Sequence, residues 1–154
     1  MAKLFNTSQD IKDLAQSKWE ETGLAQMGIN LKCISTPKAK AILKVQRANA
    51  TTNFLTKNDV ILTIFEEAFD RLTAEHKNVL MEGAISNIAY DSEKDKLNVE
   101  GDFAKEIFRM RRKYDNYVDI AEEAYIIIET IEDEERRRKE EERLAKKEKR
   151  QKKQ

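Results

Sequence analysis

Apolar residues recur every three or four positions in the N-terminal stretch NTSQDIKDLAQSKWEETG. This spacing places them on one face of an amphipathic helix, with Thr7 or Ser8 as the N-cap and Gly23 as the stop. The residues on that face are Ile11, Leu14, Ala15 and Trp19.

Three later segments have the pattern of strands. INLKCIS at 29–35 and AILKVQRA at 41–48 alternate apolar and polar residues, and Pro37 separates the two. The stretch from Val60 to Phe65 is nearly continuously apolar, which predicts a strand covered on both faces. The polar stretch NATTN is predicted to be a simple connection between strands.

A central helix is predicted for TAEHKNVLMEGAISNI, with Thr73 as its cap. AYDSEKDKLNV then predicts a hairpin, with DSEKD as the polar turn between Tyr90 and Leu97 or Val99. The apolar stripe of the helix consists of Leu72, Val79, Leu80, Gly83, Ala84, Asn87 and Ile88.

Two more helices follow, one capped by Asp102 and one that starts near Asn116. The first is expected to point Phe103, Ile107, Met110 and Tyr114 inward. The second has an apolar seam of Tyr117, Ile120, Ala121, Ala124, Ile127, Ile128 and Ile131.

The seam stops after Ile131, although the helical composition continues. This change predicts one α+β domain over residues 1–130 and a charged helical tail over 131–154. The domain is expected to have a small mixed or antiparallel sheet of three to five strands packed with helices. The tail has 11 Lys and Arg against 8 Asp and Glu, and acid-to-base pairs four residues apart support a helix there. These pairs are Glu132–Arg136, Asp133–Arg137, Glu134–Arg138 and Glu135–Lys139.

The composition indicates the cellular location and excludes one class of partner. The chain has 154 residues, of which 38% are charged and 40% hydrophobic, with a formal net charge of zero. A zero net charge argues against a uniformly basic nucleic-acid binder. Cys33 is the only cysteine, so no internal disulfide is possible, and a reduced intracellular setting fits best. We expect a cytoplasmic protein without a signal peptide or membrane span.

The stretch VLMEGAISNIAYD, residues 79–91, has the hydrophobic pattern of an active-site helix. Zinc peptidases of the zincin type place H-E-x-x-H on a helix that packs beside a sheet and leads into a hairpin. The two histidines then face one metal from one side of the helix. The glutamate takes a proton from the metal-bound water.

The order of elements over roughly residues 40–117, about half of the chain, resembles a minimal zincin-like metallopeptidase family of bacteriophages and related mobile elements. In that family a strand and a short helix lead into L-L-x-H-E-L-x-H-I-x-x-D, followed by a hairpin and a helix rich in Phe and Arg. Ile88 and Asp91 keep the flanking pattern of this motif. The resemblance implies a zincin-like fold. It also implies a phage-encoded protein of the host cytoplasm, or alternatively of the virion.

All three motif residues are replaced in this chain. The resemblance places Gly83 at the first metal ligand, Ala84 at the catalytic glutamate and Asn87 at the second ligand. The only histidine, His76, lies seven residues before Gly83 and cannot complete a three-ligand zinc site, even with Glu82. We therefore expect a pseudoenzyme with no catalytic residue, no metal and no cofactor. Gly83 and Ala84 would then allow close helix-to-sheet packing, and Asn87 would bond nearby backbone.

Two basic segments could bind an anionic partner. FRMRRKY at 108–114 interleaves cations with aromatic rings, which suits phosphates and bases, but it also suits the solvated face of an amphipathic helix. The last nine residues hold six Lys or Arg and one Glu, and form either an anionic-partner site or a solubilising tail. The candidate residues are Arg109, Arg111, Arg112, Lys113, Lys146, Lys147, Lys149, Arg150, Lys152 and Lys153.

Three functions fit these patterns, in the following order. The first is a non-catalytic adaptor or regulatory module that binds a phage or host protein. The second is a nucleic-acid-associated accessory protein that uses the basic helix and the tail. The third is an atypical metallopeptidase. No membrane partner is expected.

Overall fold

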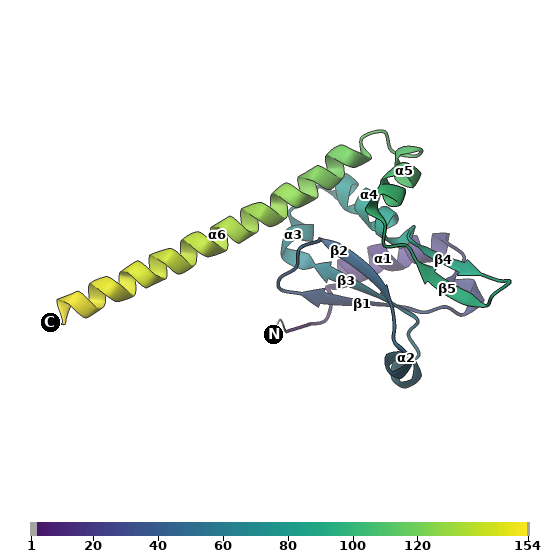
Figure 1. The fold of residues 1–154 in the computed structure, drawn as a ribbon, viewed down its shortest axis with the longest axis horizontal. Coiled ribbons are helices and arrows are strands. Elements are labelled where there is room, and N and C mark those ends of the chain that lie inside the picture. Colours follow the sequence, from purple (N-terminus) through teal and green to yellow (C-terminus); the bar gives the residue numbers. More distant parts are fainter. Residues whose placement is uncertain (1–2, 154) are drawn as a thin grey trace.

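Three strands form a mixed sheet in the order β1-β3-β2 (Figure 1). They are β1 (Leu31–Thr36), β2 (Leu43–Arg47) and β3 (Val60–Phe65). β1 is parallel to β3, and β2 is antiparallel to it. The computed structural model describes residues 3–153 of the chain. The predicted α+β fold with a small mixed sheet is confirmed, and β1 ends immediately before Pro37, as expected.

The central strand β3 has one well-covered face. Val60, Leu62 and Ile64 are fully buried in the same core as residues of α1 (Gln9–Glu21) and α4 (Ala74–Ile85). Ile61 and Thr63, which point to the other face, are only half-buried. The predicted cover on both faces is therefore incomplete.

The predicted first helix is α1, but its capping differs from the prediction. Ser8 occupies the N-cap position without a side-chain capping bond, and its N–H donates to Glu66 Oε1 at 2.7 Å. The Thr7 hydroxyl is instead buried against the Ser35 hydroxyl at 2.9 Å. Gly23 follows the helix at φ +79°, in the left-handed region that favours glycine at such ends.

The predicted polar connection at NATTN contains a helix, α2 (Ala50–Thr56). The Asn49 side chain caps it by accepting a hydrogen bond from the N–H of Thr52 at 2.7 Å. Phe54 and Leu55 of α2 are both exposed. A short 3-10 helix, η1 (Ala25–Met27), was also not predicted.

The central helix begins as predicted, after the short helix α3 (Glu66–Asp70). Thr73 caps α4 by accepting a hydrogen bond from the N–H of His76 at 3.2 Å. The helix ends at Ile85, earlier than predicted, so Asn87 lies beyond its end. The predicted hairpin is confirmed as β4 (Ile88–Asp91) and β5 (Lys96–Val99), with Tyr90 opposite Leu97.

Asp102 caps α5 (Phe103–Arg111), as predicted, by accepting from the N–H of Ala104 at 3.0 Å. Met110 is buried, but Phe103 is 47% exposed, so its inward orientation was predicted wrongly.

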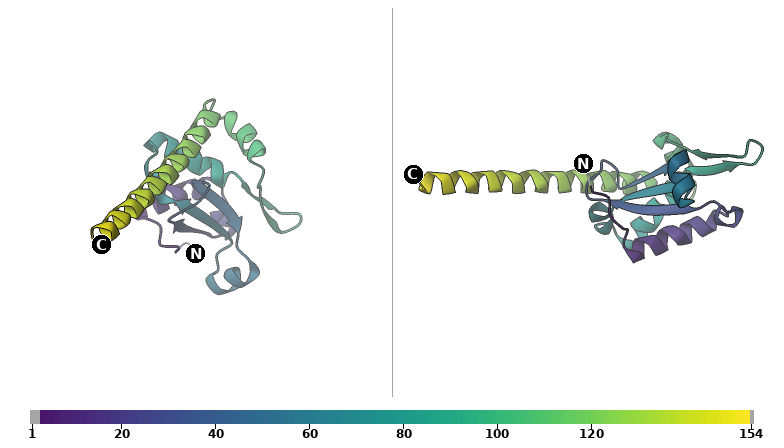
Figure 2. Two further views of the ribbon diagram at one scale, coloured as in Figure 1. Left: turned by 60° about the vertical axis from the view of Figure 1, so that its left-hand side comes forward. Right: turned by 90° about the horizontal axis from the view of Figure 1, so that it is seen from below.

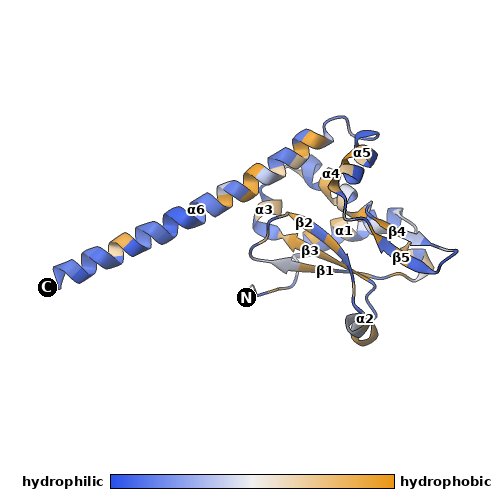
Figure 3. Ribbon diagram, viewed as in Figure 1, coloured by the Kyte–Doolittle hydropathy of each residue, from blue (hydrophilic) through white to orange (hydrophobic). Residues whose placement is uncertain are grey.

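The last helix, α6 (Tyr117–Lys152), is continuous across the predicted boundary at residue 131 (Figures 1 and 2). Its predicted seam lies against the body, although Ile127 is only half-buried, and the helix becomes strongly hydrophilic where it projects (Figure 3). Within residues 3–153, no helix combines the length and the apolar character needed to span a bilayer.

An ion pair just after Ile131 adds to the contacts between α6 and the body. Arg71 of the segment after α3 binds Glu134 with both guanidinium nitrogens, Nη1 to Oε1 at 3.2 Å and Nη2 to Oε2 at 2.7 Å. Of the four predicted pairs, the described residues form Glu135–Lys139 at 3.0 Å. Arg136 pairs with Asp133 instead.

Candidate functional site

Gly83 of α4 packs directly against Tyr117 at the start of α6. A Cβ added to Gly83 would lie 2.1 Å from the Tyr117 hydroxyl oxygen and 2.9 Å from its Cζ. Tyr117 is 1% exposed, so its ring is packed inside the protein against α4. The expected close approach at Gly83 is present, but its partner is α6 rather than the sheet.

The Tyr117 hydroxyl is held by Glu106 of α5. It donates to Glu106 Oε2 at 2.8 Å, while Asn87 Nδ2 donates to Glu106 Oε1 at 2.5 Å. Arg109 Nη1 donates to Asn87 Oδ1 at 3.1 Å and to Ser86 Oγ at 2.7 Å. We refer to Ser86, Asn87, Glu106, Arg109 and Tyr117 as the Glu106 network. The predicted backbone role of the Asn87 side chain is therefore wrong, because it bonds two side chains of α5.

Burial raises the pKa of Tyr117 far above its usual value, and the neighbouring charge of Glu106 raises it further. The hydroxyl therefore stays protonated and remains a hydrogen-bond donor at every physiological pH. Glu106 and Tyr117 were not identified from the sequence as members of the site. They fill the space beside Gly83 of α4.

Ala84 faces a cavity of about 220 Å³ between α4, α5, α6 and the start of β2. The polar groups at its wall come from Lys40, Glu106 and Tyr117, and the remaining lining residues are apolar. Phe103 and Tyr125 are among the lining residues and are 47% and 58% exposed. The other lining residues are Ala41, Ile42, Leu43, Leu80, Ala84, Ala121, Ala124 and Ile128.

The edge of β2 that faces away from β3 has unpaired backbone. The N–H of Phe65 donates to the carbonyl of Ile42 at 2.9 Å, and the N–H of Ala48 donates to the carbonyl of Asp59, also at 2.9 Å. Along an antiparallel strand, residues whose N–H and carbonyl groups bond to a given neighbouring strand alternate with residues whose groups point away from it. Between Ile42 and Ala48, every second residue of β2 therefore points its backbone groups away from β3. These outward-pointing residues are Leu43, Val45 and Arg47.

Within residues 3–153, no strand pairs with this edge of β2, but β5 lies near it and Arg47 Nη1 donates to the carbonyl of Leu97 at 3.5 Å. The open part of the edge is therefore the stretch from Leu43 to Val45. The opposite edge of the sheet is partly covered, because Phe5 exchanges two backbone hydrogen bonds with Ser35 of β1, at 3.0 and 2.9 Å. Leu43 belongs both to the open edge and to the cavity wall. The open edge and the cavity therefore form one continuous surface.

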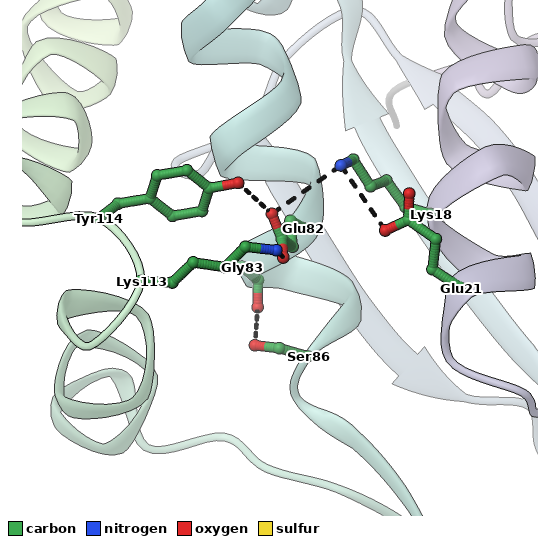
Figure 4. Close-up of polar contacts among 7 residues, drawn as sticks. All are labelled: Lys18, Glu21, Glu82, Gly83, Ser86, Lys113 and Tyr114. Atoms are coloured by element: carbon green, nitrogen blue, oxygen red, sulfur yellow. Dashed lines mark hydrogen bonds and ion pairs between the residues drawn. The ribbon is translucent and has the colours of Figure 1, made fainter.

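A second polar cluster surrounds Glu82, next to Gly83 (Figure 4). The Glu82 carboxylate pairs with Lys113, accepts a hydrogen bond from the Tyr114 hydroxyl at 2.5 Å, and lies 3.8 Å from Lys18 Nζ. The Lys18 side chain is only 10% exposed and also lies 3.8 Å from Glu21. This cluster joins α1, α4 and the segment after α5.

The predicted basic cluster at 108–114 is divided by these contacts. Arg109 and Lys113 are bound to groups near the end of α4, so they are not available as a shared surface. Arg112 lies over the exposed ring of Phe108, 4.8 Å from its centroid, and Arg111 is exposed. The predicted residues of the tail, from Lys146 to Lys153, are all exposed.

His76 contacts Glu123 of α6, with Nδ1 2.5 Å from Oε2. Among residues 3–153, no group of three or more His, Cys, Asp or Glu side chains is placed to hold a metal ion.

Comparison of the chain with protein-family models, curated proteins and solved structures gave no match.

Proposed function

We propose that this protein is a non-catalytic, phage-type adaptor with a degenerate metallopeptidase-like, zincin-like scaffold that binds an extended segment of a phage or host protein in the cytoplasm. The observation that carries the proposal is the open edge of β2 beside the cavity. That cavity is lined by Ala84, at the position of the catalytic glutamate in the family pattern.

The edge offers backbone groups in the arrangement that an added strand requires. Leu43 and Val45 direct their N–H and carbonyl groups outward, and a short peptide laid along them would continue the sheet. The mostly apolar cavity next to Leu43 can receive an apolar side chain of that peptide. Backbone bonds then supply affinity, and the cavity supplies selectivity.

The non-catalytic part of the proposal is supported by Tyr117. Its buried hydroxyl lies where the side chain of a first metal ligand at position 83 would begin, and Glu106 fixes it there. Position 84 has no general base, and Asn87 is engaged by Glu106 and Arg109. Positions 83 and 87 therefore supply no ligand for a zinc ion, and position 84 supplies no acceptor for a proton of a zinc-bound water.

We expect the purified protein to contain far less than one zinc ion per chain, because residues 3–153 bring no set of three metal ligands together. Elemental analysis of protein prepared without chelator measures this directly. Thermal melts with and without a strong chelator should coincide. A zinc content of about one per chain, lost together with stability on chelation, would contradict the proposal.

The β2 edge can be tested with Val45→Pro. Proline removes the outward N–H of Val45 without removing a bond to β3, so it should block an added strand while the domain still folds. Val45→Ala is the matched control, because it also shortens the side chain but keeps the N–H. Peptides selected from a random library on the intact protein should bind Val45→Ala and lose at least about tenfold in affinity for Val45→Pro.

Equal affinity of the selected peptides for both variants would show that they bind elsewhere. Thermal melts of the two variants provide the folding control. If Val45→Pro binds the peptides as well as the intact protein does, strand addition at β2 is excluded.

A further inference from the structure

The projecting end of α6 gathers basic side chains on one face. Arg143, Lys146, Lys147 and Arg150 are all exposed, and the helix is continuous through Lys152. At about 100° per residue, these four positions lie within about 100° of the helix circumference. We refer to them as the basic stripe.

The acidic residues of this part of α6 lie opposite the stripe or at its borders. At about 100° per residue, Glu141 and Glu148 lie on the opposite side of the helix, whereas Glu140 and Glu142 border the stripe. Within residues 3–153, no ion pair includes any of the four stripe residues. Their charges are therefore directed to solvent rather than neutralised by the protein.

We infer that the basic stripe is a docking surface for the phosphate backbone of a nucleic-acid duplex. Its four cations are about 4.5, 1.5 and 4.5 Å apart along the helix axis, at ~1.5 Å per residue. A duplex strand presents one phosphate charge about every 3.4 Å along its own axis, so several contacts can form at once. This surface is separate from the β2 edge and independent of the proposed adaptor function.

Other anionic partners fit the stripe less well. A helix that lies on a membrane needs an apolar face, and one that enters a protein groove needs apolar anchors. Leu144 is the only large apolar side chain between Glu132 and Lys153, and it lies outside the stripe, 48% exposed. The projecting rod, which stands clear of the body, leaves room for a bulky duplex beside it (Figure 2).

The test compares two triple variants with equal charge change. Arg143→Gln, Lys146→Gln and Arg150→Gln together remove three of the four charges of the stripe. Arg137→Gln, Arg138→Gln and Lys152→Gln together remove three charges from the opposite side. Glutamine keeps helix propensity, which circular dichroism verifies. Binding of a fluorescent random-sequence DNA duplex of ~25 base pairs is followed by anisotropy over a range of salt concentrations.

We expect the stripe variant to bind the duplex at least about tenfold more weakly and to lose about 2–3 from the slope of log K against log salt. The control variant should stay within about threefold of the intact protein. Equal losses in both variants would show that net charge alone is responsible. Absence of duplex binding by the intact protein, or tighter binding to polyglutamate or phosphatidylserine vesicles, would overturn the inference.

Discussion

Replacing Gly83 with alanine is expected to lower the free energy of unfolding by about 3 kcal/mol, the upper end of the usual cost of overpacking. The new Cβ would lie 2.1 Å from the Tyr117 hydroxyl oxygen, and Glu106 holds that oxygen in place. In an open helix interior, the same change stabilises by up to about 1 kcal/mol. The expected effect therefore has the opposite sign to helix propensity. Urea denaturation measures it.

Gly101 provides the matched control for this substitution. A Cβ at Gly101 would meet no atom within 4 Å, so Gly101→Ala should change stability by less than about 0.5 kcal/mol. Adding Tyr117→Phe to Gly83→Ala removes the closest clashing atom, so the combined loss should be smaller than the sum of the separate losses. A Gly83→Ala protein as stable as the intact one would mean that Tyr117 does not fill this site.

Replacing Glu82 with alanine should cost about 2–3 kcal/mol at neutral pH, because it leaves a largely buried Lys18 with a single carboxylate. That remaining carboxylate belongs to Glu21, 3.8 Å from Lys18 Nζ. Lys113 loses the same partner, but its side chain is 60% exposed and water replaces the contact. Glu129→Ala, an exposed acid on α6, is the control and should have little effect.

The same cluster predicts a pH dependence of stability. Burial by itself raises the pKa of Glu82, but hydrogen bonds from Lys113 and Tyr114 and the charges of Lys113 and Lys18 outweigh it and lower that pKa. A carboxyl whose pKa is lower in the folded state stabilises the protein above its unfolded pKa, and this contribution disappears as the pH falls through the folded pKa. The intact protein should therefore exceed Glu82→Gln in stability at pH 7 and lose this advantage in acid.

Urea denaturation of the two proteins from pH 7 down to about pH 3 measures this change. An advantage that stays constant over the whole range would show that ionised Glu82 is not what holds α1, α4 and Tyr114 together.

Local sequence signals predicted most of the elements correctly. The helix caps at Thr73 and Asp102 could be read from single residues, and the seam of α6 could be read from its periodicity. Tertiary contacts did not override these local signals. Helix α2 was missed because it has no buried face. Its largest side chains, Phe54 and Leu55, are 75% and 73% exposed, so no apolar periodicity marks it.

The candidate site was predictable only in part. The pattern located Gly83, Ala84 and Asn87, but not the side chains that now surround them. Glu106 and Tyr117 come from two later helices, and their approach to α4 depends on tertiary packing that no local spacing encodes. The open edge of β2 was also beyond local reasoning, because the strand order β1-β3-β2 is not the order of the chain.

The buried seam of α6, which ends at Ile131, anchors the projecting helix to the body, and the bidentate pair between Arg71 and Glu134 follows it directly. Because α6 is unbroken from this anchor to Lys152, the rotational position of every side chain beyond it is set by counting residues. One residue inserted after the anchor would turn Arg143 and Arg150 by about 100° around the axis, whereas seven would return them almost to their starting orientation. The number of residues between the anchor and the stripe therefore determines the side of α6 on which the positive charge lies, relative to the body of the protein.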